Sequence, residues 1–154
     1  EHGAAPNLTY DERYSVMWYL AGSDLSEFLE LALEYGGDAN WLGGNSTIIN
    51  PAITFGRVEN IKILIDAGAD VNFQNRVSGG TPLHAAGGTR QYQIAYMLLE
   101  AGADPRINDN NGQNGLLGPI EKSGRPGGDD VYAWRQKVIE YLRGIGMEVT
   151  PQDP

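Results

Sequence analysis

Side chains suited to acid–base or metal chemistry are few in this chain of 154 residues. His2 and His84 are its two histidines and it has no cysteine, so the sequence predicts neither a zinc site nor a Ser–His–Asp set. Asp129 and Asp130 can be read as cation ligands, but neighbouring carboxylates in a Gly-rich loop are usually solvated. His84 follows Thr-Pro-Leu, and we predict that its ring hydrogen-bonds locally and braces a turn. We therefore expect no catalytic residue, no metal and no cofactor.

The charge of the chain indicates which partners it can take. Its formal net charge is −9 and its isoelectric point is near 4.5. Nucleic acids and anionic membranes both need a basic face, so these composition values argue against them and favour a basic partner. The longest apolar run, residues 16–21, is too short to cross a bilayer. We expect a single domain that binds a protein and does not insert into a membrane.

A sequence pattern that repeats about every 33 residues predicts the helices and loops on which these side chains lie. Its clearest copy opens at residues 80–86, where Thr81 predicts a helix N-cap and Pro82 suits the first helical turn. A second helix follows with apolar residues at helical spacing, and Gly102 ends it. Each copy therefore predicts two short helices joined by a turn and followed by a projecting loop, which we call a finger.

The pattern recurs at constant spacing. The closing glycines Gly36, Gly68 and Gly102 are each preceded by a hydroxyl residue 21 positions earlier. These residues predict three equivalent N-caps: Ser15, Thr47 and Thr81. We predict units at about 13–46, 47–79, 80–112 and 113–149, the last with an inserted loop at 121–130. A flexible lead-in at 1–12 and a flexible tail at 150–154 flank this single domain.

The expected helices follow from the same register. In the first unit we predict a helix at 13–21 and a second one after a capping box that begins at Asp24. The second helix is expected to bury the apolar residues Leu25, Phe28, Leu29, Ala32 and Leu33. In the last unit, Arg135 is expected on a polar outer face, which the end of a repeat stack needs in water.

Repeat stacks of this kind bind along a concave side made of finger tips and the ends of first helices. Register places these residues there: Thr54, Phe55, Gln74, Arg76, Val77, Thr89, Arg90, Asn108 and Asp109. Phe55 and Arg90 stand out because aromatic and arginine side chains often dominate binding energy. The alternative for each is an ordinary surface residue. Trp41, Phe73 and Ile107 occupy equivalent finger positions, either as an apolar ridge for a partner or stacked on one another.

The signature Thr-Pro-Leu-His-x-Ala at residues 81–86 resembles the ankyrin repeat. This resemblance implies an all-α fold, an ankyrin-repeat solenoid of about four helix–turn–helix units with projecting fingers. Thr47 departs from the signature, because Ile48-Ile49 follows it in place of Pro-Leu.

Longer phrases at residues 28–40, 58–74 and 132–142 are similar to ankyrin-type immunity proteins of bacterial type VI secretion systems. Members of that group neutralise phospholipase D-type lipase effectors by binding them. The resemblance implies a non-enzymatic periplasmic protein, often a lipoprotein, whose partner is a cognate phospholipase effector. A general ankyrin adaptor of the bacterial cytoplasm is the alternative. Because the chain begins with Glu1 rather than Met, we expect a trimmed or processed N-terminus, with any export signal upstream.

Overall fold

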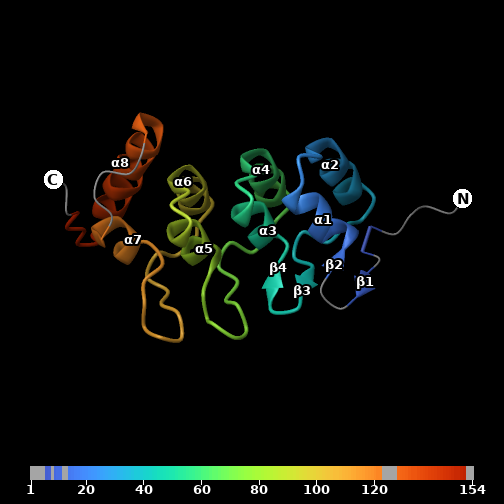
Figure 1. Cartoon of the computed structure of the whole chain (residues 1–154), viewed down its shortest axis with the longest axis horizontal. Helices are drawn as coiled ribbons and strands as arrows, with labels where there is room; N and C mark the ends of the chain where they lie inside the picture. The colour runs from blue at the N-terminus through green and yellow to red at the C-terminus, as the bar shows by residue number, and fades with distance from the viewer. Residues whose placement is uncertain (1–5, 8, 12–13, 123–127, 152–154) are drawn as a thin grey trace, which may run out of the picture.

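The computed structural model describes residues 6–7, 9–11, 14–122 and 128–151. Within these ranges four helix pairs stand side by side in a row, and loops project from one edge (Figure 1). The pairs, in chain order, are α1 (Val16–Gly22) with α2 (Ser26–Glu34), α3 (Ile49–Thr54) with α4 (Val58–Asp66), α5 (Pro82–Gly88) with α6 (Tyr92–Glu100), and α7 (Leu117–Lys122) with α8 (Asp129–Gly144). The predicted all-α solenoid is confirmed, whereas the exact unit boundaries stay a prediction.

Closing glycines end the second helix of each pair. Gly36, Gly68, Gly102 and Gly146 have φ angles of +88°, +83°, +92° and +81°. This left-handed conformation costs an L side chain energy but costs glycine little. The spacing of these glycines in the sequence therefore marks the positions where the backbone ends each second helix in a left-handed conformation.

The predicted hydroxyl N-caps are confirmed in the first and third units and fail in the second. The Ser15 Oγ accepts a hydrogen bond from Trp18 N–H at 3.1 Å at the start of α1. Thr81 precedes α5, as predicted, and Pro82 is the first helical residue. The prediction for Thr47 is wrong, because Ile48 is the N-cap of α3 and its own φ and ψ are helical. The buried Thr47 hydroxyl makes no hydrogen bond in the described part of the structure.

Short strands explain two of the shifted helix starts. Strands β3 (Leu42–Gly43) and β4 (Ser46–Thr47) form a hairpin, which holds Thr47 opposite Leu42. Strand β1 (Thr9–Asp11), in the segment expected to be a loose lead-in, pairs with β2 (Tyr14–Ser15). Because residues 14–15 are extended, the helix expected at 13–21 begins only at Val16.

The capping box expected at Asp24 is absent. Helix α2 begins after Leu25, which makes no side-chain cap, and the Asp24 carboxylate instead forms an ion pair with Arg57. The expected burial of this helix is only partly right. Leu29 is fully buried, but Leu25 and Phe28 are 43% and 56% exposed.

Stacking of the pairs forms one continuous apolar core. Leu29, Ile61 and Ala95, at equivalent positions, are all fully buried. The prediction for Arg135 is wrong: its side chain is fully buried and its guanidinium donates to the Ile120 carbonyl of α7 at 2.8 Å. Both ends of the loop expected at 121–130 are helical, since α7 extends to Lys122 and α8 begins at Asp129. Residues 123–127 lie outside the described part.

A ladder of asparagine side chains ties neighbouring units together. Asn40 donates to the Gly68 carbonyl at 2.9 Å and accepts from Asp70 N–H at 2.6 Å. Asn72 makes the same pair of bonds with Gly102 and Asp104, at 3.1 and 2.7 Å. One amide side chain thus satisfies a carbonyl and an N–H at the helix end of the next unit. Arg106 takes the next place in the ladder and donates to the Ile145 carbonyl.

Candidate protein-binding surface

The second finger presents Gln74, Arg76 and Val77 to solvent, as predicted from register. Asn75 shapes this finger, because its Oδ1 accepts hydrogen bonds from the N–H groups of Val77 and Ser78, each at 3.0 Å. The loop therefore turns back on itself and leaves the Val77 side chain 70% exposed. An apolar side chain held out at a loop tip is available for contact with a partner.

The third finger contains Asn108 and Asp109. The Asp109 Oδ1 accepts from the N–H groups of Gln113 and Asn111, both at 2.8 Å. The Gln113 bond is the main cause that lowers the pKa of Asp109, because it favours the charged carboxylate. This half-buried side chain is engaged within its own loop, while Asn108, which pairs with Asn114 through the backbone, is exposed.

Backbone hydrogen bonds join the fingers to one another. Arg76 N–H donates to the Asn45 carbonyl at 3.2 Å, which links the first finger to the second. Asn110 N–H donates to the Ser78 carbonyl at 2.9 Å, which links the second finger to the third. The finger edge is thus one connected surface rather than three independent loops.

The remaining predicted residues lie at the other ends of the first helices. Thr54 and Phe55 end α3, and Thr89 and Arg90 follow α5. The two threonine hydroxyls donate back to carbonyls of their own helices, at 2.9 and 2.8 Å. Because a first helix of six or seven residues is about 10 Å long, the structure divides the nine predicted residues between a finger edge and a turn edge. We use "turn edge" for residues 22–25, 54–58 and 89–91, where first helices meet second helices.

Phe55 on the turn edge borders a hollow that sequence reasoning did not identify. Its lining includes Trp18, Tyr19 and Leu25, and its volume is about 540 Å³. Tyr19 is 64% exposed and Phe55 is 55% exposed. Helical spacing was the available signal for Tyr19, since Met17, Leu20 and Ala21 turn inward and leave it on the outer side.

Glycine lets the Phe55 ring approach α1 closely. A Cβ atom added to Gly22 would lie 3.0 Å from the Phe55 ring. Arg57 frames the same hollow, because its Nε donates to the Gly22 carbonyl at 3.0 Å while its guanidinium pairs with Asp24. An exposed aromatic ring beside a fixed arginine is the composition typical of a binding hot spot.

Arg90 borders a second hollow on the turn edge, between α6 and α8. The hollow has a volume of about 310 Å³ and is also lined by Asp130, Val131 and Trp134. The ammonium group of Lys137 lies 4.0 Å from the centre of the Trp134 ring, within range of a cation–π interaction. Phe55 and Arg90 therefore stand beside successive hollows of the same edge.

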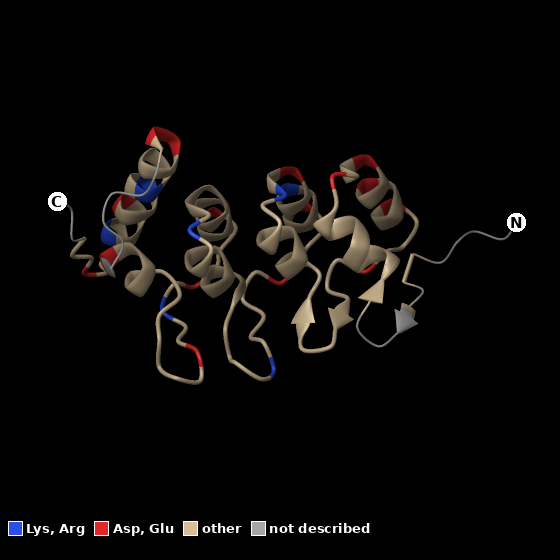
Figure 2. Cartoon of the chain, in the orientation of Figure 1, with Lys and Arg blue, Asp and Glu red and all other residues tan. Residues whose placement is uncertain are grey.

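Acidic residues are concentrated on α2 and α4, on the side away from the fingers (Figure 2). Glu30 and Glu34 of α2 line a hollow together with Glu59 and Asp66 of α4. The same hollow contains one lysine, Lys62. This charge favours encounter with a basic partner, in line with the overall composition.

His84 has the structural role that the sequence predicts. Its Nδ1 accepts from Thr81 N–H at 3.1 Å, and its Nε2 faces the Gln113 carbonyl at 3.0 Å. Because a carbonyl oxygen only accepts, Nε2 is the protonated nitrogen in this arrangement. Both ring nitrogens are therefore engaged, one with the start of α5 and one with the next unit.

The described residues contain neither a group of metal-ligating side chains nor a helix suited to crossing a membrane. Within them, no three His, Cys, Asp or Glu side chains are grouped as metal ligands. No helix in the described ranges has the length and apolar character needed to cross a membrane. What the surface does offer is two separate edges with exposed aromatic, aliphatic and arginine side chains.

Comparison with known proteins agrees with this architecture. A family model described as "Ankyrin repeats (3 copies)" matches residues 16–109. The chain is 39% identical over 128 residues to the E3 ubiquitin-protein ligase Ufd4 of Drosophila melanogaster, covering 82% of this chain and 4% of that protein. It is 45% identical over 58 residues to the palmitoyltransferase AKR1 of Kluyveromyces lactis, covering 38% of this chain and 8% of that protein.

A third relative is the human ARF GTPase-activating protein GIT2, 32% identical over 93 residues, which cover 60% of this chain and 12% of that protein. The chain thus spans only a small part of each relative. The stacked helix pairs that match the family model form a repeat fold with an extended surface for binding other proteins. The family-model match extends over more than half of the sequence, and the chain belongs to the ankyrin-repeat family.

Proposed function

We propose that this chain is a periplasmic immunity protein that binds and inhibits a cognate type VI secretion phospholipase effector. Support for a protein-binding role comes from the ankyrin fold. Support for the immunity role comes from the phrases at residues 28–40, 58–74 and 132–142, which resemble that bacterial group. In this proposal the chain catalyses nothing and acts by covering the surface of the toxin.

The observation that carries the binding mode is the Phe55 hollow. An aromatic ring that is 55% exposed lies beside exposed Tyr19 and next to the Arg57–Asp24 ion pair. Isolated exposed apolar residues are common, but an apolar cluster bordered by charge is typical of a contact site. The turn edge is thus the anchor in this proposal, and the exposed residues of the finger edge extend the contact.

Co-expression tests the proposal. Bacteria that export the phospholipase to the periplasm should survive when they also export this chain, and lyse when they export the Phe55→Ala variant. Truncation of such an anchor should weaken binding at least tenfold, corresponding to about 1.4 kcal/mol or more. Glu140→Ala is the control, because Glu140 is exposed on α8 and lies outside both edges, and it should protect as well as the native sequence. Lysis with the native chain exported would contradict the immunity role.

A general adaptor is the second candidate function, and the two separate edges favour it. An adaptor holds two proteins at once, so the finger edge and the turn edge would each take one. Capture experiments with Val77→Asp and Phe55→Asp variants distinguish the two functions. If the chain is an adaptor, each variant should lose a different partner. If the chain is an immunity protein, only one partner is captured, and no second partner is lost with either variant.

A further inference from the structure

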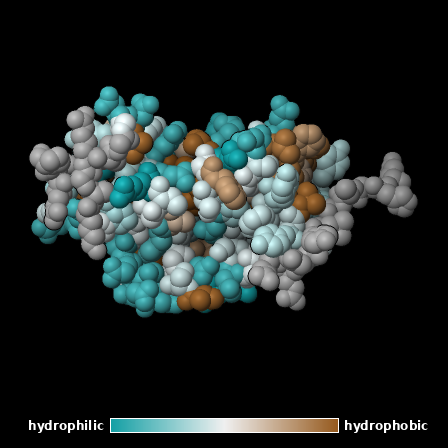
Figure 3. Space-filling view, viewed as in Figure 1, coloured by the Kyte–Doolittle hydropathy of each residue, from teal (hydrophilic) through white to brown (hydrophobic). Residues whose placement is uncertain are grey.

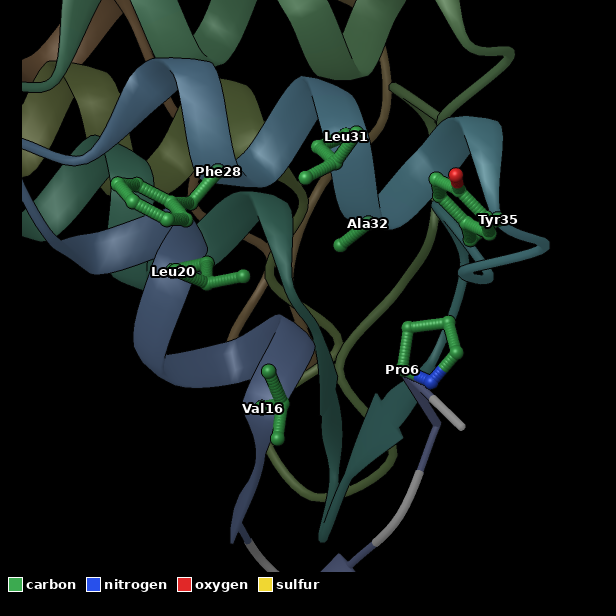
Figure 4. A pocket seen from close by; sticks show the side chains of 7 residues that line it. All are labelled: Pro6, Val16, Leu20, Phe28, Leu31, Ala32 and Tyr35. Atoms are coloured by element: carbon green, nitrogen blue, oxygen red, sulfur yellow. The ribbon is translucent and has the colours of Figure 1, made fainter. Parts of the chain in front are cut away.

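The outer face of the first helix pair, on the side away from α3 and α4, is apolar and largely uncovered. Val16, Phe28, Leu31 and Tyr35 are between 48% and 73% exposed there. They line a hollow of about 380 Å³, with Pro6 at its border (Figure 4). Hydrophobic residues also gather over this N-terminal end of the molecular surface (Figure 3). A repeat stack that ends in water needs a polar outer face, which this end does not have.

Equivalent positions in later units are buried. Phe28 corresponds in register to Asn60 and Ile94, which are 2% and 1% exposed. Val16 corresponds to Ile48, which is fully buried. The covering comes from the preceding unit, as Asn60 shows: its amide donates to the Leu20, Ala21 and Ser23 carbonyls at 2.8–3.1 Å. The face of α2 therefore has the composition of an interface between two units.

Asn7 makes the hydrogen bonds of a residue from a preceding unit. Its amide donates to the Gly36 carbonyl at 3.0 Å, and its Oδ1 accepts from Asp38 N–H at 2.9 Å. Asn40 and Asn72 make the same two bonds to the closing glycine and aspartate of the unit that follows each of them. The asparagine ladder thus extends one step beyond the first helix pair.

The sequence register agrees with this position. Residues 1–7 read Glu-His-Gly-Ala-Ala-Pro-Asn, and residues 100–106 read Glu-Ala-Gly-Ala-Asp-Pro-Arg. The two segments share Glu, Gly, Ala and Pro at four of seven positions, and Gly3 precedes Gly36 by 33 residues. Asn7 in turn precedes Asn40 by 33 residues, between the 32 that separate Asn40 from Asn72 and the 34 that separate Asn72 from Arg106. The segment has the sequence that follows a second helix, not that of an unrelated leader.

We propose that residues 1–7 are the end of a further ankyrin unit, whose helix pair lies upstream in the same polypeptide and covers the outer face of α1 and α2. Its two helices pack on Phe28, Leu31 and Val16, as α1 and α2 pack on α3 and α4. This occupant accounts for the apolar face, the Asn7 hydrogen bonds and the register together. A second copy of the chain or a foreign partner on this face accounts for the first of these alone.

Hydrogen exchange on two lengths of the protein tests this proposal. The product translated from the natural start codon is compared with the chain of residues 1–154. We expect amide exchange across residues 28–34 to slow at least tenfold in the longer product, because a covering unit restricts local opening of α2. Phe28→Asp should lower the Tm of the longer product by roughly 5–10 °C and barely change that of the shorter chain.

Phe55→Asp is the matched control, since Phe55 has the same exposure but lies on the turn edge. It should shift the Tm of both lengths equally. Equal exchange across residues 28–34 in the two products would overturn the proposal, as would a gene whose codons before Glu1 encode no helix pair. Self-association of the shorter chain through Phe28, with α2 still exchanging freely in the longer product, would assign the face to a second copy instead.

Discussion

Gly87 of α5 lies directly against the backbone of Gly115 in the following unit. A Cβ atom on Gly87 would stand 2.0 Å from the Gly115 carbonyl oxygen, and one on Gly115 would stand 2.7 Å from the His84 Cα. Two glycines are therefore needed for the third and fourth units to approach this closely. Side chains of any size at either position would push the units apart.

Alanine at two adjacent glycines of α5 should change the free energy of unfolding in opposite directions. Gly87→Ala overlaps backbone that has no room to move, so we expect it to lower the free energy of unfolding by about 2–4 kcal/mol. Gly88→Ala meets no atom within 4 Å and gains helix propensity, which should raise stability by up to about 1 kcal/mol. Urea unfolding of the two variants measures both changes. Equal changes in the free energy of unfolding would contradict the close contact between Gly87 and Gly115.

The asparagine ladder should contribute measurably to unit stacking. Asn40→Ala removes hydrogen bonds to the Gly68 carbonyl and the Asp70 N–H, so we expect a loss of roughly 1–2 kcal/mol. Asn111→Ala is the control, because its side chain bonds to Asp109 of the same finger, and it should change stability by less than about 0.5 kcal/mol. Chemical denaturation distinguishes the two, and matching losses would show that the ladder adds nothing specific.

His84 should matter for stability and not for turnover. His84→Ala loses the bonds to Thr81 N–H and to the Gln113 carbonyl, which we expect to cost about 1–3 kcal/mol. Thermal unfolding measures the loss. Hydrolase assays on native protein and variant should find no activity that depends on His84. Turnover that disappears with the substitution would mean that this ring is catalytic.

Left-handed backbone at Arg90 predicts that glycine stabilises this position. Arg90 has φ +57°, and the equivalent residue of the preceding unit, Gly56, has φ +66°. Gly56→Ala should lower stability by about 1 kcal/mol, because alanine is strained there. Arg90→Gly should raise it by a smaller amount, since glycine loses more chain entropy on folding. Calorimetry tests both signs, and a destabilising Arg90→Gly would imply that the arginine side chain itself holds the turn.

Acid should loosen the third finger through Asp109. Hydrogen bonds from the Gln113 and Asn111 N–H groups lower the pKa of this carboxyl below the usual value of about 3.9. With a folded pKa below the unfolded one, the contribution is complete above about pH 4 and is lost as the pH falls through the folded pKa. The amide NMR signals of both donors should report this titration, and Asp109→Asn should abolish it. Signals that titrate unchanged in the variant would assign the effect to another group.

Local chemistry is what made the repeat predictable from the sequence. A glycine that closes a helix, such as Gly102, and a cap such as Ser15 act within a few residues of themselves, so residue type and spacing are enough to find them. Thr47 shows where this reasoning fails. The hairpin with Leu42 determines its backbone, and strand pairing across a turn is not visible in a cap motif.

Burial was harder to predict because it depends on the neighbouring unit. Phe28 occupies a position that is buried in the second and third units, but on the outer face of the first helix pair it is 56% exposed. Arg135 was placed on an outer face by its charge, yet the Ile120 carbonyl of α7 accepts its hydrogen bond inside the core. Helical periodicity shows which residues share a face and not what that face meets.

The candidate surface was predicted in part for the same reason. Register located Phe55 and Arg90 correctly at the ends of first helices. It did not show that Tyr19 and Leu25, from the unit before, complete the Phe55 hollow. Contacts between successive units create that hollow, so no single repeat contains it. That these residues bind a partner stays a prediction.

Titration of the cognate phospholipase with purified chain tests the proposed function most directly. We predict that lipase activity falls in proportion to added chain and reaches baseline at one equivalent, and that a Tyr19→Ala, Phe55→Ala double variant requires at least a tenfold excess. Glu140→Ala, on the exposed side of α8, should behave like the native chain. Full lipase activity at and beyond equimolar native chain would contradict inhibition by binding.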